Sequence, residues 1–299
     1  MRESKEGVMK HLAIWVCALL AAIAATAQQR IEERAAADPE GLVEVSNTAG
    51  SVRVTAWNRP EVEVSGTLAK GAARLEFESR RGRTVVRVVT APLGRTIEPA
   101  DLVIRVPVGS RLDVSGVSAQ VEVTGVAGPI DVETVSGGIR ISGLARSVAA
   151  RSVSGPIELD AVGAAVQVRS VSGQVKVLGA AGELTATTVS GRVQVEAGEL
   201  ARAELSSTSG SLAIATGVAA LGRLEARTVS GGVDLTLPAG QDAHLLVKTF
   251  SGAVQHNLEG VHEHAPSRGP GRELEATLGE GSARITVNTF SGGVRLVVR

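Results

Sequence analysis

Residues 132–160 read VETVSGGIRISGLARSVAARSVSGPIELD, and this stretch holds two copies of one short unit. In each copy, Val-Ser-Gly leads into alternating apolar and polar residues, as in Ile139-Arg140-Ile141 and Ile157-Glu158-Leu159. Alternation of this kind over a short run is typical of a strand with one buried face. Because Ser and Gly favour tight turns, each copy is predicted to be a turn followed by a strand.

The same unit recurs along most of the chain. The copies at Val135, Val153, Val171 and Val189 follow one another at a constant interval, and Val117-Ser118-Ala119 begins the series one period earlier. The later copies, at wider intervals, are Thr208-Ser209-Gly210, Val229-Ser230-Gly231, Phe250-Ser251-Gly252 and Phe290-Ser291-Gly292. A period of about 18 residues that already contains its own strands is too short for a crossover helix. Equivalent strands are therefore expected to stack in parallel, as successive turns of a solenoid.

The predicted fold is all-β, a single-domain parallel β-solenoid (β-helix) with coils of about 18–21 residues and an N-terminal β cap. This fold makes a prediction about register. The central exposed residues of successive strands, Glu122, Arg140, Glu158, Lys176 and Gln194, should be neighbours in the stack. Their charges alternate in sign up to Lys176, and opposite charges directly across a strand pair stabilise a sheet.

The chain is expected to divide into three segments and an insertion. These are a signal peptide at 1–27, an N-terminal β cap with a first degenerate coil at 28–116, and solenoid repeats at 117–299 with a loop insertion around 253–288. Within the cap, residues 75–78 and 85–89 favour a hairpin. The apolar strand Val294–Arg299 ends the chain, so its edge is either covered by the insertion or open to a partner.

Composition limits the kind of core and the kind of partner. The chain has 35 Gly, 3 Phe, 2 Trp and no Tyr, so the core is expected to be thin and aliphatic. Basic and acidic residues balance at 31 each. Such a balance gives no basic surface for phosphates, so nucleic acid is not an expected partner.

The N-terminus is typical of an export signal. Lys10 precedes an apolar run at 12–25, and Ala25-Thr26-Ala27 supplies the small residues of a cleavage site, so the mature chain would begin at Gln28. An uncleaved anchor is the alternative, but the run is shorter than the ~20 residues of a spanning helix. Cys17 lies in a poor lipoprotein context. We expect an exported protein, periplasmic or at the cell surface or extracellular, with no transmembrane span after cleavage and no disulfide.

Hydroxyl residues flank the recurring Val and form two columns in the predicted stack. They are a candidate binding face, and turn hydrogen bonding is the structural alternative. The residues are Thr134, Ser136, Ser152, Ser154, Ser170, Ser172, Thr188, Ser190, Thr228 and Ser230.

Five residues of neighbouring coils have the side chains that a polysaccharide-cleaving site would need. Asp131, Glu133, Arg151, Asp160 and Arg169 do not offer two carboxylates held at a fixed separation, which glycoside hydrolysis requires. The repeated Ser residues have no adjacent base to activate them. We therefore predict no catalytic residue.

A histidine cluster lies in the expected insertion. His256, His262 and His264, with Glu259 and Glu263, contain ligand types that suit zinc, copper or nickel. The segment is polar and is interrupted by Pro and Gly, and no His is held on a strand pattern. A loop is the favoured interpretation, and no metal-binding or cofactor-binding residue is predicted.

Three features carry a resemblance to a known family. They are the run from Leu102 to Pro107 with Gly109, the Val-Ser-Gly series, and the stretch from Ala283-Arg284-Ile285 through Asn288-Thr289-Phe290-Ser291-Gly292. Over about residues 40–299 the chain resembles a bacterial putative adhesin family with β-strand repeats, an exported domain of unknown function. The resemblance implies a β-solenoid outside the cytoplasm and brings no catalytic motif.

Three hypotheses about function follow. The first is an exported, non-enzymatic β-solenoid that acts as an adhesin-like binding surface at the cell envelope, for an envelope, carbohydrate or protein ligand of unknown identity. The second is a structural or envelope-stress-sensing scaffold. A polysaccharide-acting enzyme is the least favoured.

Overall fold

The computed structural model describes most of the chain after the predicted signal segment. The described residues are 28–69, 73–80, 82–90, 99–160, 163, 165–261, 264 and 270–299. The predicted signal peptide at 1–27 lies outside them. Within these ranges the regular structure is entirely β, and none of the described segments forms an apolar helix of membrane-spanning length.

The strands fall into an N-terminal group and a repeat group. The N-terminal group is β1 (Gln28–Ala36), β2 (Leu42–Trp57), β3 (Glu61–Ala69), β4 (Ala73–Arg80), β5 (Arg83–Thr90), β6 (Ala100–Pro107) and β7 (Arg111–Thr124). The first repeats are β8 (Ile130–Thr134), β9 (Ile139–Ser142), β10 (Ser147–Ser152), β11 (Ile157–Asp160), β12 (Ala165–Ser170), β13 (Val175–Leu178), β14 (Gly182–Thr188) and β15 (Val193–Ser207). The chain ends with β16 (Leu212–Thr228), β17 (Val233–Leu237), β18 (Ala243–Thr249), β19 (Val254–His256), β20 (Arg272–Leu278), β21 (Ala283–Thr289) and β22 (Val294–Val298).

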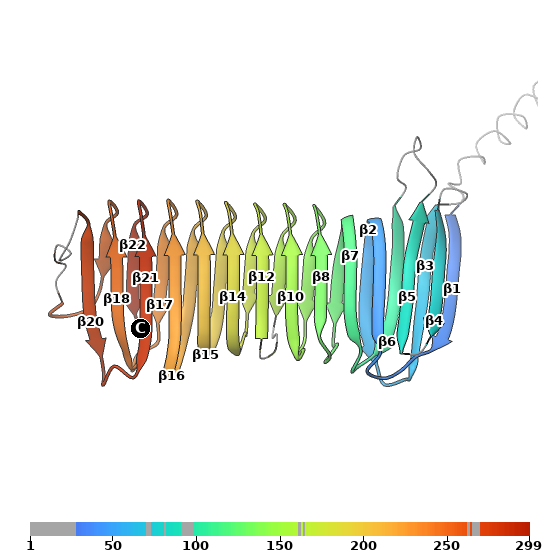
Figure 1. Cartoon of the computed structure of the whole chain (residues 1–299), viewed down its shortest axis with the longest axis horizontal. Coiled ribbons are helices and arrows are strands. Elements are labelled where there is room, and N and C mark those ends of the chain that lie inside the picture. The colour runs from blue at the N-terminus through green and yellow to red at the C-terminus, as the bar shows by residue number, and fades with distance from the viewer. Residues whose placement is uncertain are drawn as a thin grey trace, which may run out of the picture.

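Each coil contributes one strand to each of two sheets. The strands that enter the Val-Ser-Gly turns form the leading sheet, and those that leave the turns form the following sheet. The long strands β2, β7, β15 and β16 bend from one sheet into the other. The coils stack along one axis, with the Val-Ser-Gly turns in a row along the upper edge of Figure 1. The predicted β-solenoid is confirmed.

The order of strands shows how the coils follow one another. The leading sheet runs β4, β5, β2, β7, β8, β10, β12, β14, β15, β16, β21, β18, β20. The following sheet runs β1, β3, β6, β2, β7, β9, β11, β13, β15, β16, β17, β22, β19. Apart from β20, which is antiparallel to β18, the strands of the repeat group pair in parallel, as expected for a solenoid.

A thin aliphatic core lies between the sheets. Val132, Ala150, Val168 and Ala186 are buried on successive strands of the leading sheet, facing larger residues such as Leu159 of the following sheet. Small residues on one sheet let the two sheets approach closely, which explains why so few aromatic residues are needed.

The last coil differs from the sequence expectation. β22 lies between β17 and β19, and β21 lies between β16 and β18, so the final coil is inserted between two earlier ones. The strand that was expected to end the stack is therefore internal. Within the expected 253–288 loop insertion, residues 254–256, 272–278 and 283–288 instead lie in the strands β19, β20 and β21. The long interval between the Phe250 and Phe290 copies arises because chain order and stacking order diverge here.

Antiparallel strands lie at the N-terminal end of both sheets and at the C-terminal end of the leading sheet. β4 pairs with β5 as the predicted hairpin, with Leu75 opposite Val88, and β1 and β3 cover the other sheet at the N-terminal end. β20 covers β18 at the C-terminal end. Charged residues on these edges, such as Arg74, Glu76 and Glu275, oppose pairing with further chains.

Candidate binding surface

The Val-Ser-Gly turns place three kinds of side chain at fixed positions. The residue before Val points inward, as Thr134 does at 1% exposure, because it shares the inward side of the strand with Val132. Val135 lies on the outward side with Glu133. Gly137 then lets the chain turn back beside the preceding coil, where an added Cβ would lie 1.8 Å from the carbonyl oxygen of Ala119.

The inner hydroxyl column is buried and serves the turn. Thr134 donates from Oγ1 to the carbonyl of Gly137 at 2.8 Å, and Ser170 donates to Gly173 in the same way at 3.1 Å. In Thr188 the hydroxyl instead accepts from the N–H of Gly191 at 3.1 Å. The candidate-face residues buried in this column are Thr134, Ser152, Ser170, Thr188 and Thr228. They are therefore not available to a ligand at the surface.

The outer hydroxyl column is exposed, but it also bonds to the backbone. The hydroxyl of Ser154 donates to the carbonyl of Val135 at 3.3 Å, and Ser172 donates to Val153 at the same distance. The candidate-face residues in this column are Ser136, Ser154, Ser172, Ser190 and Ser230, and each donates to the preceding coil. Their donors are used within the fold, and acceptor capacity remains at the surface.

Apolar side chains, not hydroxyls, form the most prominent feature of this edge. Eight of them stand in single file and are between 44% and 55% exposed. We call them the turn ridge. In stacking order they are Val117, Val135, Val153, Val171, Val189, Val229, Phe290 and Phe250. Thr208 interrupts the row between Val189 and Val229, above a shallow hollow of about 530 Å³. The other exposed large apolar residues in the described ranges are Val108, Leu144 and Leu221.

The sequence contained a signal for the turn ridge that the hydroxyl columns obscured. Strand alternation places Val135 on the same side as Glu133, which is outward. Replacement of Val by Thr208 in one copy and by Phe in two others is what an exposed position tolerates. The hydroxyl residues recur at every turn because they hydrogen-bond the backbone of the turn, as Thr134 and Ser154 do.

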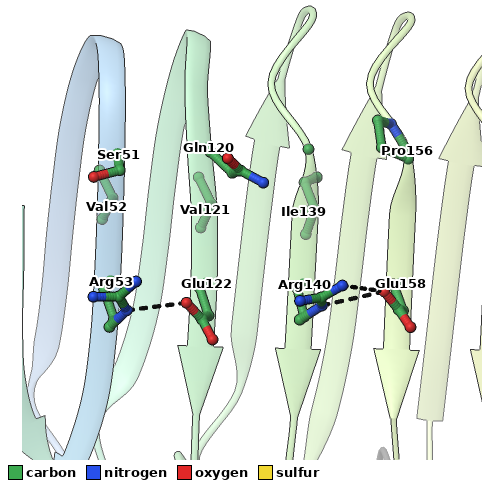
Figure 2. Close-up of a pocket in the computed structure, with 11 residues that line it drawn as sticks. Ser51, Val52, Arg53, Gln120, Val121, Glu122, Ile139, Arg140, Pro156 and Glu158 are labelled. Carbon is green, nitrogen blue, oxygen red and sulfur yellow. Dashed lines mark hydrogen bonds and ion pairs between the residues drawn. The ribbon is translucent and has the colours of Figure 1, made fainter. Parts of the chain in front are cut away.

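A ladder of charges crosses the following sheet. The predicted neighbours Glu122, Arg140, Glu158, Lys176 and Gln194 are paired in register, which confirms the expected stacking. Residues of this ladder line a hollow of about 210 Å³. Figure 2 shows the lining residues and a further rung of the ladder, Arg53, beside Glu122.

The rungs are held together in pairs. Arg53 donates to Glu122 at 3.0 Å, and Arg140 donates twice to Glu158, at 2.7 and 3.1 Å. Hydrogen bonding from Arg140 lowers the pKa of Glu158 from its usual range, and the charge of Lys176 lowers it further. The five rungs from Arg53 to Lys176 therefore alternate in sign without a break.

Reversing one rung should weaken the stack in a salt-dependent way. In Arg140→Glu, two attractions become repulsions from Glu122 and Glu158, so the thermal unfolding midpoint should fall by about 2 °C at low salt. Near 1 M salt the Debye length is about 3 Å, shorter than the ~4.8 Å between strands, and the loss should shrink. Calorimetry at two salt concentrations measures the effect.

Rescue of this variant must involve five residues. Reversing Glu122, Arg140, Glu158 and Lys176 alone would place a new cation beside Arg53, so the full rescue also reverses Arg53. The fivefold variant should recover most of the lost stability at low salt. A fivefold variant no more stable than Arg140→Glu would contradict in-register charge pairing.

The leading sheet carries an acidic row that sequence reasoning missed. Glu44, Asp113 and Asp131 are direct neighbours in register, although Asp113 and Asp131 stand one repeat period apart and could have been matched. Partial burial between coils raises the pKa of Asp113, and repulsion from Asp131 and Glu44 raises it further. Because the Asp113 side chain is still exposed, burial costs it little stability. Repulsion from Asp131 and Glu44 is therefore the effect that a mutation of Asp113 can test. Arg83 and Arg151 offset part of it by pairing with Glu44 at 2.5 Å and Asp131 at 2.6 Å.

Removing the charge of Asp113 should stabilise the protein at neutral pH. The raised pKa means that the ionised form costs stability, and this cost disappears as pH falls through the pKa. Asp113→Asn should therefore gain about 0.5 kcal/mol at pH 7, and the gain should vanish below about pH 3. Urea unfolding at both pH values measures it. Asp160→Asn is the control, since Asp160 lies between Ser142 and Leu178 and should show no gain.

The five residues that resemble a polysaccharide-cleaving set do not converge. Asp131, Glu133, Arg151 and Arg169 lie on the leading sheet, where Arg151 is beside both Glu133 and Arg169. Asp160 lies on the following sheet. Arg151 binds Asp131 as an ion pair, so one of the carboxylates is already held by a cation.

The histidine cluster is partly described. His256 accepts from the N–H of Leu258 through Nδ1 at 3.3 Å, and His264 pairs with Glu273 through backbone hydrogen bonds. His262 and Glu263 lie outside the described residues. Among the residues whose placement is described, no group of three His, Cys, Asp or Glu side chains could hold a metal ion.

Comparison with known proteins bears on the fold. A family model described as Toastrack DUF4097 matches residues 41–297. The chain is similar to a solved structure from Parabacteroides distasonis ATCC 8503 named "putative lipid binding protein", with 11% identity, TM-score 0.52, and 90% of this chain and 96% of that chain covered. A "putative adhesin" from Bacteroides fragilis NCTC 9343 has 10% identity and TM-score 0.40, with 90% and 97% covered. No curated protein sequence matches the chain. At 11% identity the likeness to the first of these structures concerns the fold alone.

Proposed function

Since the chain belongs to the Toastrack DUF4097 family, we propose that it is an exported, non-enzymatic β-solenoid that presents an adhesin-like binding surface at the cell envelope. Membership confirms the family resemblance found in the sequence. The observation that carries the proposal is the turn ridge, eight exposed apolar side chains aligned on a rigid scaffold. Contiguous exposed apolar surface is typical of interaction sites.

The chemistry of the turns supports binding over catalysis. Ser154 and Ser172 donate to backbone carbonyls and not to a base, so their hydroxyls are not activated. The carboxylates of the leading sheet lie on an open face, where Asp131 pairs with Arg151. Two-sided backbone pairing of the coils fixes the ridge in place, which reduces the entropy lost when a partner binds.

Binding to envelope material tests the proposal. The labelled mature protein should bind saturably to envelope fragments from the native host, and unlabelled protein should compete for the same sites. Equal, non-saturable retention of labelled protein and an unrelated protein of similar charge would contradict a specific binding surface.

The proposed location rests on the N-terminal export pattern. If the protein is exported and processed, its N-terminus should be Gln28, because cleavage follows Ala27. Mass spectrometry of the intact protein from the native host measures this. Recovery of chains that begin at Met1 or Met9 from the cytosol would contradict export.

A further inference from the structure

We propose that the turn ridge is a lipid-docking edge, which inserts its apolar side chains between the headgroups of an anionic membrane surface. This inference rests on the proposed binding function and names the chemistry of the partner. The ridge is one side chain wide, and its residues are about half exposed. A straight, narrow apolar row of this kind suits the boundary between headgroups and acyl chains, where apolar residues are buried to a shallow depth.

The charges beside the ridge have the sign that anionic lipids attract. We define the flanking positions as the residue two before each ridge residue and the residue three after it. Over the eight ridge residues, these flanking positions hold five cations and one anion, Glu133. The cations are Arg151, Arg169, Arg192, Arg227 and Lys248. The acidic residues Asp113, Asp131 and Glu225 stand one outward position further from the ridge. Positive charge is thus concentrated next to the apolar row, although the protein as a whole has no net charge.

Three of the five cations form ion pairs, and these pairs do not use all of their hydrogen-bond donors. Arg151 and Lys248 pair with Asp131 at 2.6 Å and Glu273 at 3.0 Å, and Arg227 pairs with Glu225. Asp131 and Glu225 lie further from the ridge than the arginines they pair with, so guanidinium donors of Arg151 and Arg227 remain beside the ridge. Glu273, in contrast, lies directly across the strands from Lys248. Arg169 is flanked in register by Arg151 and Thr187, so it has no acidic neighbour directly across the strands.

The ridge is less suited to a carbohydrate. Phe250 and Phe290 are stacked with ring centroids 4.6 Å apart and planes 5° apart. Because they are neighbours along the stack, each ring uses one face against the other, and that face is closed to a sugar. The adjacent serines already donate to backbone carbonyls, as Ser251 does to Phe290 at 3.5 Å. Sugar recognition requires free donors and acceptors together.

A second copy of the chain is also less suited. Two copies meeting ridge to ridge would bring five cations of one against five of the other, which is unfavourable. A single file of half-exposed side chains also falls short of the ~800 Å² per partner that stable protein interfaces bury. Lipid is therefore the occupant that the observations favour.

Vesicle sedimentation with matched variants tests the inference. The ridge variant carries Val153→Thr, Val171→Thr, Val189→Thr, Phe250→Thr and Phe290→Thr. Threonine is suitable because Thr208 already occupies a ridge position. The control carries Val108→Thr and Leu144→Thr, which are 41% and 74% exposed away from the ridge. All proteins are purified in mature form, with the same N-terminus verified by mass spectrometry, so the leader cannot contribute to binding.

The inference predicts binding to phosphatidylcholine vesicles that contain about one-third phosphatidylglycerol, and weaker binding to pure phosphatidylcholine. The ridge variant should lose at least tenfold in partition coefficient, and the control should match the wild type. Arg169→Gln with Arg192→Gln should weaken binding to the anionic vesicles, whereas Arg111→Gln with Arg284→Gln should not. Circular dichroism confirms that each variant keeps the β fold.

Other outcomes would overturn the inference in distinguishable ways. If the wild type binds envelope fragments but neither kind of vesicle, the lipid assignment is wrong and the proposed binding function stands. If it binds neither, both fail. Equal vesicle binding by the wild type and the ridge variant would show that the turn ridge does not contact the lipid. A wild-type dimer in analytical ultracentrifugation that the ridge variant dissociates would assign the ridge to a second copy instead.

Discussion

Gly155→Ala is expected to destabilise the protein by at least about 3 kcal/mol. In the stacked turns, a Cβ on Gly155 would lie 2.0 Å from the carbonyl oxygen of Gly137 and 2.6 Å from its carbonyl carbon. Both atoms belong to the backbone of the preceding coil, which cannot move without breaking its own ladder. The coils would therefore have to separate at this edge. Urea unfolding followed by circular dichroism measures the loss.

Gly138→Ala is the matched control. Gly138 lies in the preceding turn of the same kind, but its added Cβ would meet the Pro156 side chain at 3.5 Å, which is ordinary contact. We expect its stability to stay within about 0.5 kcal/mol of the wild type. If the two substitutions cost the same, the close backbone approach of successive turns is wrong.

Leu296→Ala should cost about 2–4 kcal/mol, although Leu296 stands near the end of the chain. Terminal strands usually fray, and truncation there costs little. Here β22 is inserted between β17 and β19, so Leu296 lies beside Leu235 and is completely buried. The cavity left by alanine would be enclosed by strands on both sides. Thermal and urea unfolding of the variant measure the cost.

Val297→Ala provides the comparison on the same strand. Val297 points to the outer side of the following sheet and is only partly buried, so its truncation should cost less than about 1 kcal/mol. A small effect at both positions would indicate that the last strand frays, and the inserted position of the final coil would then be wrong.

The sequence predicted the stacking of coils because spacing carries that information directly. Glu122, Arg140 and Glu158 are each one repeat period apart and fall in register. Spacing could not predict the order of the last coils. Phe250 precedes Phe290 in the chain, yet the turn of Phe290 stacks on that of Val229, because the final coil entered between two earlier ones. The unusually long interval between the two turns was the sole hint.

The Val-Ser-Gly turns that carry the proposed surface could be located from the sequence, but the residues predicted there were the hydroxyls beside Val135 and not the exposed Val135 itself. Thr134 is buried because strand alternation places it on the same inward side as Val132. The exposure of Val135 was not expected, because aliphatic residues are usually buried. The pairing of Asp113 with Asp131 was not predicted, because the first recognisable copy of the repeat begins at residue 117, after Asp113.

The most direct test of the account is a disulfide between consecutive turns. The one cysteine of the chain, Cys17, lies in the predicted leader, so the mature protein offers a clean background. In Val153→Cys with Val171→Cys, two exposed ridge positions on adjacent coils would be about 5 Å apart between Cα atoms, within disulfide range. In Val153→Cys with Val189→Cys, the two cysteines would lie two coils apart, and their Cα atoms would be ~10 Å apart, too far for a disulfide. We expect rapid intramolecular oxidation of the first pair and none of the second. Equal oxidation of both pairs, or none of the first, would contradict the in-register stack that forms the ridge.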